Sequence, residues 1–162
     1  MSITVLESIS VELLRRLNLL VNNDGAYQTD VCEAIRPTRF GTWTPQDLQI
    51  LLTKGSEEVI DELSFPGNPP SIARRQTFNI RCHVMADEQD TTAIETIINT
   101  FAADVVLAVC SETEWYQFDG NSINAEWLAT EDIQADGGVD GVNVPIAIIY
   151  RTDEDDPYQV RA

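Results

Sequence analysis

Gln76–Met85, which reads QTFNIRCHVM, alternates apolar and polar side chains over its whole length. Successive side chains of a strand point to opposite faces of a sheet, so this run predicts a half-buried antiparallel strand. Its apolar face would carry Phe78, Ile80, Cys82 and Val84. Residues 142–150 alternate in the same way and predict a second such strand, with a buried face made of Val142, Val144, Ile146, Ile148 and Tyr150.

Two helices are expected to cover this sheet. The first begins at the capping box Thr4–Glu7 and continues to Val21, with apolar residues three or four positions apart. The second follows another capping box, Thr92–Glu95, and runs to Cys110. Shorter strand-like runs are 27–36, 48–53, 115–118 and 123–129, with a turn expected at Lys54-Gly55. The run 57–63 is either a further strand, which we favour, or a helical turn. The order predicts an α+β fold, a mainly antiparallel sheet with two helices packed on one face and extended loops or arms.

The C-terminal region sets the expected domain boundary. A chain of 162 residues fits one domain with its own core. We expect this domain to span 1–151 and an acidic tail, 152–162, to be mobile or docked on a neighbour. Pro145 has no N–H to donate, so the last strand is expected to lie at a sheet edge or to carry a bulge there.

A proline-rich connection is the most distinctive local feature. Ser64–Ile72 contains three prolines and can form neither a helix nor a central strand. Long connections of this kind are often functional, and proline lowers the entropy cost of docking an extended arm. The loop 40–45 carries two aromatic residues that either contact a partner or fold back on the core. The candidate interface residues are therefore Phe40, Trp43, Pro66, Pro69, Pro70, Arg74 and Arg75.

The residues that could support catalysis are few. His83 is the only histidine, and no nucleophile is placed beside it by the sequence, so we expect it to be exposed or at an interface. Three widely spaced cysteines favour neither disulfides nor a zinc site, and each is expected to be a small buried side chain. Asp136–Gly141 lacks the ligand pattern of a calcium loop. We therefore expect no enzyme activity, no cofactor and no metal.

The charge is unusual in both size and distribution. The net charge is −17, and residues 82–150 contain no lysine or arginine. Such a chain repels nucleic acids and anionic lipid, and a membrane partner is not expected because no run of eighteen apolar residues occurs. Two explanations of this charge stay open. One is solubility in a salty setting, and the other is a surface along which nucleic acid must slide.

Most of the chain resembles the tail terminator, or tail completion, proteins in the neck of tailed bacteriophages. The stretches that carry the resemblance are the early helix, Arg36–Arg39, Phe65–Cys82, Asp140–Pro145 and Tyr150–Tyr158. These motifs are structural rather than chemical. The resemblance implies a hexameric ring of identical subunits in the virion, assembled in the host cytoplasm, that caps the tail tube protein and docks to the connector or head-completion protein.

In such a ring, DNA passes transiently through the lumen, and an acidic lining would limit sticking. The candidate channel-facing residues are Asp87, Glu88, Asp90, Asp136 and Asp140. Related neck, head-completion and minor tail proteins share this size and acidity, so each is an alternative. An acidic DNA-mimic inhibitor and a carboxylate-based metal-dependent enzyme are further alternatives from other classes.

Overall fold

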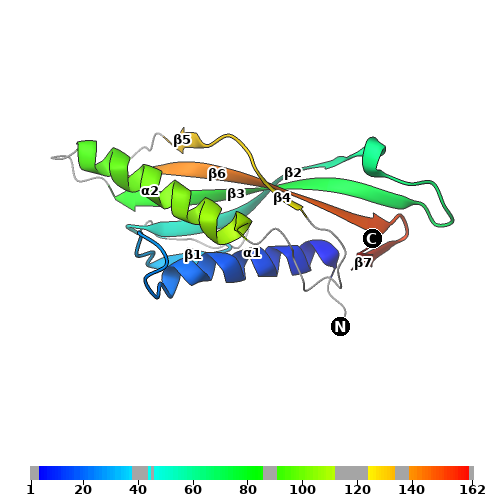
Figure 1. Ribbon diagram of the computed structural model, residues 1–162, viewed down its shortest axis with the longest axis horizontal. Helices are drawn as coiled ribbons and strands as arrows, with labels where there is room; N and C mark the ends of the chain where they lie inside the picture. The colour runs from blue at the N-terminus through cyan, green and yellow to red at the C-terminus, as the bar shows by residue number, and fades with distance from the viewer. Residues whose placement is uncertain are drawn as a thin grey trace.

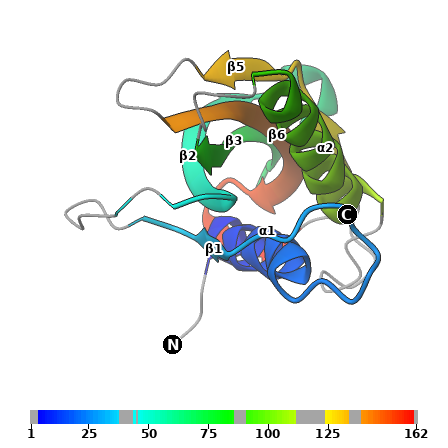
Figure 2. The same cartoon turned by 90° about the vertical axis from the view of Figure 1, so that its left-hand side faces the viewer.

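A curled sheet with two helices across its open side forms the fold (Figures 1 and 2). The computed structural model describes residues 4–37, 44, 46–85, 91–111, 124–133 and 139–160. Within them, the elements are α1 (Val5–Val21), β1 (Glu33–Ile35), β2 (Gln49–Val59), the 3-10 turn η1 (Asp61–Leu63), β3 (Ser71–Met85), α2 (Thr91–Cys110), β4 (Asn124–Trp127), β5 (Glu131–Ile133), β6 (Val139–Asp153) and β7 (Asp156–Val160). The predicted α+β class is confirmed.

The long strands β3 and β6 form the centre of the sheet. They pair antiparallel along their whole length, from Ser71 opposite Asp153 to Met85 opposite Val139. The strand order is β1-β2-β3-β6-β4, and β5 and β7 also pair with β6. Only β1 is parallel to its neighbour. The sheet is therefore mainly antiparallel, as predicted.

The core lies between the sheet and the helices. The alternating side chains of β3 and β6 predicted to be buried all belong to it. Fully buried Ile9, Leu13 and Leu17 come from α1, and Phe101 and Val105 come from α2. Each such side chain contributes roughly 1.5–3 kcal/mol by leaving water. The two helices also contact each other, so both pack on the same face of the sheet.

The first helix begins where the sequence predicts. The Thr4 hydroxyl accepts the Glu7 N–H at 3.2 Å, which satisfies one free donor of the first turn. The Glu7 carboxylate does not complete the capping box in the expected way but binds Arg36 at 2.7 and 3.1 Å. This ion pair ties the start of α1 to the residue that follows β1.

Two of the predictions about the strands were wrong. The expected strand 27–36 is paired only over Glu33–Ile35. The expected turn at Lys54-Gly55 is an irregularity inside one long strand, β2, which continues to Val59 opposite Arg74. A Cβ on Gly55 would lie 3.0 Å from the Asn79 amide nitrogen and 3.2 Å from the Thr77 carbonyl oxygen, so glycine fits this close approach. The expected strand 115–118 lies outside the described residues.

The prediction that Pro145 marks a sheet edge or a bulge was also wrong. Strand β6 is paired on both sides, with Pro145 opposite Asn79 of β3. On the other side, β4 ends opposite Ile146 and β5 begins opposite Asn143. The Pro145 carbonyl accepts the Leu128 N–H at 3.0 Å in the gap between them. The proline is tolerated because the missing donor faces this interruption.

The acidic C-terminal residues are not a separate tail. Strand β6 continues to Asp153, and β7 turns back to pair with it. The Glu154 N–H also donates to the Pro70 carbonyl at 2.9 Å. The expected boundary at residue 151 therefore falls inside a strand, and residues 152–160 belong to the sheet.

Candidate functional site: a projecting arm and a basic pocket

An arm extends the sheet beyond the helices (Figure 1). We define the arm as residues 59–70, which are the last residue of β2 and the connection to β3. Its base is held by the Ile60 N–H to the Ala73 carbonyl at 2.9 Å, and its outer part by two bonds between Phe65 and Ser71 at 2.8 and 3.0 Å. The proline-rich run predicted as an extended arm thus forms the end of a β-hairpin with fixed backbone hydrogen bonds.

The arm exposes apolar side chains beside acidic ones. Val59, Leu63 and Phe65 are 54%, 37% and 52% exposed, and Asp61 and Glu62 are exposed as well. Arg151 lies over the Phe65 ring at 4.8 Å from its centre. Exposed aromatic and aliphatic groups on a projecting element are typical of protein contact surfaces. Pro66 is exposed, and Pro69 and Pro70 are half-buried in the same arm.

The two arginines expected at a subunit contact have partners within the chain. Arg75 binds Glu58 at 2.6 Å and lies 3.7 Å from Glu126. Arg74 donates to the Thr152 hydroxyl at 2.7 Å and lies 3.6 Å from Glu57. Both pairs fasten neighbouring strands at the base of the arm. A contact of either arginine with a second subunit remains a prediction.

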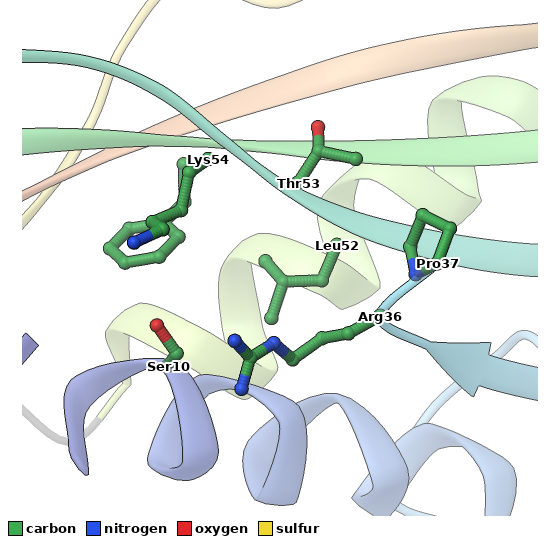
Figure 3. A pocket seen from close by; sticks show the side chains of 7 residues that line it. Ser10, Arg36, Pro37, Leu52, Thr53 and Lys54 are labelled. Atoms are coloured by element: carbon green, nitrogen blue, oxygen red, sulfur yellow. The ribbon is translucent and has the colours of Figure 1, made fainter. Parts of the chain in front are cut away.

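A pocket of about 450 Å³ lies between β2 and α1 (Figure 3). The basic pocket, as we call it, has cationic groups from Arg36 and Lys54, which project into the same space (Figure 3). Its other lining residues are Ser10, Pro37, Leu52, Thr53 and Phe78. Two cations and an apolar floor suit a ligand that has both a carboxylate and a hydrophobic part.

The charges in the basic pocket do not cancel. The Glu7 carboxylate raises the pKa of Arg36, and the Arg36 hydrogen bond lowers the pKa of Glu7, with Lys54 adding a smaller effect in the same direction. Lys54 is exposed, and it is the only lysine of the chain. Two positive groups therefore face one carboxylate in a chain of net charge −17.

This pocket was not predicted from the sequence. Its lining comes from four separate segments, and Lys54 was assigned to a turn rather than to a strand facing the core side. The sequence held one signal for it. Lys54, the single lysine, comes two residues after buried Leu52, and residues i and i+2 of a strand share a face, so Lys54 lies on the Leu52 side of the sheet.

The titratable side chains in the sheet are perturbed mainly by burial. His83 is only 7% exposed, so of the two expectations the exposed position is wrong, and the interface position stays a prediction. Burial and, to a smaller degree, Arg81 lower its pKa. Burial raises the pKa of Cys82, and burial followed by Glu57 raises the pKa of Tyr150. Cys32 is exposed, so the prediction that every cysteine is buried was wrong for it. In the described part of the chain, no group of three His, Cys, Asp or Glu side chains is placed to hold a metal ion.

Helix α2 has the length and apolar character of a membrane-spanning segment over Ala93–Cys110, with a mean hydropathy of 1.7. One side of it is part of the core, where Phe101, Val105 and Val109 are fully buried. Core helices of soluble proteins can have the same length and hydropathy, so these two properties are weak evidence for a membrane partner.

Of the acidic residues proposed for a channel, only Asp140 lies in the described part of the chain. Asp140 lies in β6 opposite Val84. The remaining candidates Asp87, Glu88, Asp90 and Asp136 lie outside the described residues, as do the aromatic candidates Phe40 and Trp43.

Comparison with known proteins adds no family to this picture. The sequence matches no protein-family model, and no curated protein is significantly similar to it. The likeness to phage neck proteins therefore rests on the stretches quoted above. The arm and the basic pocket are the two surface features from which a function can be argued.

Proposed function

We propose that the chain is a structural subunit of a tailed-phage virion, of the tail terminator type. Identical copies form a ring, expected to be hexameric, that caps the tail tube protein and docks to the connector. Assembly takes place in the host cytoplasm, and the protein works without catalysis or a cofactor. A head-completion or minor tail role is the nearest alternative.

The projecting arm is the observation that carries this proposal. A hairpin end with about half of Val59 and Phe65 exposed is costly in water unless the apolar groups are covered in an assembly. The backbone bonds between Phe65 and Ser71 hold it in shape beforehand. A preorganised arm loses little conformational entropy when it docks, which favours a stable contact between subunits.

The charge supports a surface that does not retain DNA. The net charge of −17 gives a field that opposes contact with phosphates, which suits a ring through whose lumen the genome must pass. An acidic DNA-mimic inhibitor would share this charge. That alternative leaves the apolar arm without a role, because a DNA mimic presents carboxylates rather than hydrophobic side chains.

Inactivating the gene in the phage that encodes it tests the proposal. We expect electron microscopy to show overlong tails or tails without heads, because nothing terminates the tube or joins it to the connector. Purified protein added back is expected to co-sediment with isolated tail tubes. Normal infectious particles from the mutant phage would contradict the proposal.

A further inference from the structure

We infer that the basic pocket receives the arm of a second copy of this chain. The inference rests on the proposed ring and names the contact that holds neighbouring subunits together. The η1 turn of the arm (Asp61–Leu63) would place its two carboxylates against Lys54 and Arg36 and its leucine against the apolar floor.

Charge complementarity identifies the occupant. The pocket joins two cations and one carboxylate, while η1 adds Asp61 and Glu62, which are consecutive in the sequence and both exposed. Each copy carries a net charge of −17, so most surfaces of two copies repel each other. A contact that places acidic side chains of one copy against a basic recess of the other is therefore favoured. Docking also draws the carboxylates into a partly buried site, where screening by salt is weaker.

The apolar parts match as well. Leu52 and Phe78 form a buried floor at 4% and 1% exposure, and Pro37 adds to the wall. Leu63 follows the two carboxylates directly and is 37% exposed on the arm. A pocket of about 450 Å³ accommodates one leucine side chain with flanking carboxyl groups.

The arm and the pocket are different surfaces of one subunit. The arm points away from the helices along β2 and β3, and its backbone bonds to Ala73 and Ser71 prevent it from folding back onto its own pocket (Figure 1). A contact between unlike surfaces of identical chains is heterologous, and such contacts close into rings or extend into filaments. This geometry agrees with a ring subunit and differs from a two-fold dimer.

Zero-length carbodiimide crosslinking of the assembled protein tests the contact directly. Lys54 is the only lysine, so a bond between its amine and a carboxylate identifies one site without ambiguity. Rings built from mixed light and heavy isotope-labelled subunits separate crosslinks between chains from those within a chain. We expect interchain peptides joining Lys54 to Asp61 or Glu62.

Charge exchange gives an independent readout. We expect Lys54→Glu to weaken assembly about tenfold or more, measured by sedimentation velocity, and the double variant Asp61→Lys with Glu62→Lys to do the same. We expect a variant with all three substitutions to recover assembly. Arg81→Glu is the matched control, because it makes the same change in charge on the opposite face of the sheet and should assemble like the wild type. Circular dichroism confirms that each variant is folded.

The outcomes separate this inference from the proposed function. A ring in which Lys54 crosslinks only to other carboxylates or not at all, or in which Lys54→Glu assembles like Arg81→Glu, overturns the inference and leaves the ring intact. A protein that neither assembles alone nor binds tail tubes overturns the proposed function and the contact together.

Discussion

At the scale of single residues, a buried ion pair within α1 contacts the second helix through its arginine. Glu12 and Arg16 are 2% and 3% exposed, and the Arg16 Nε lies 3.0 Å from a Glu12 oxygen. The Arg16 guanidinium also donates to the Val109 carbonyl at 2.8 Å, near the C-terminal end of α2. A cation at this position is favourable because the free carbonyls of a helix end carry partial negative charge.

Removing one partner of this pair is expected to destabilise the fold strongly. Glu12→Ala removes the carboxylate that lies 3.0 Å from the buried Arg16 guanidinium, which costs about 3–5 kcal/mol. The double variant Glu12→Leu with Arg16→Met should recover most of that loss, since no charge is then buried. Urea unfolding of the three proteins measures this. A single variant within 1 kcal/mol of the wild type would show that the pair has no such role.

His83 is expected to make stability depend on pH in a defined window. Its folded pKa is lowered by burial, so the unfolded chain takes up a proton first as the pH falls below about 6.5. The stabilising effect of a neutral His83 is therefore complete above that pH and is lost as the pH falls toward the folded pKa.

We expect His83→Gln to remove this part of the pH dependence. The measurement is the free energy of unfolding from pH 7.5 down to pH 5, taken as the difference between variant and wild type at each pH. A difference that does not change with pH would contradict the expectation, because the carboxylates are common to both proteins.

At the scale of elements, close contact between β3 and β6 depends on a glycine. A Cβ on Gly141 would overlap the carbonyl oxygen of Cys82 and lie 3.4 Å from the His83 Cα. The obstacle is main chain and cannot move aside as a side chain would. Gly141 therefore permits these two central strands to pair in register up to Met85.

Gly141→Ala is expected to lower stability by about 1–3 kcal/mol or more through overpacking. Gly55→Ala is the comparison, because its nearest neighbour is the flexible end of Asn79, and a smaller loss is expected. Chemical denaturation of both variants gives the two values. Equal losses would mean that the contact with the Cys82 main chain is not the limiting one.

The elements also show what can be read from the sequence. The strands β3 and β6 and both helices were predicted because their apolar periodicity is long and regular. The error at Lys54-Gly55 arose because the same dipeptide serves a turn or an irregular strand, and only pairing with β3 distinguishes them. Pro145 was misplaced for a related reason, since the break between β4 and β5 opposite it cannot be seen locally.

At the scale of the whole molecule, the arm and the basic pocket lie at separate places on one chain. The proline-rich run 64–72 predicted the arm from the sequence. The pocket was not predicted, because its residues come from α1, the segment after β1, β2 and β3 and meet only in the folded chain. The distribution of acidic residues was evident from the sequence, and their placement along a channel stays a prediction.

Quantitative mass spectrometry of purified virions tests the central claim most directly. A tail terminator subunit is expected at a fixed, small copy number of about six per particle, the number that a single closed ring requires. Counting against the tail tube and portal proteins of the same particles supplies the internal scale. Absence of the chain from purified virions would contradict a structural role in the virion.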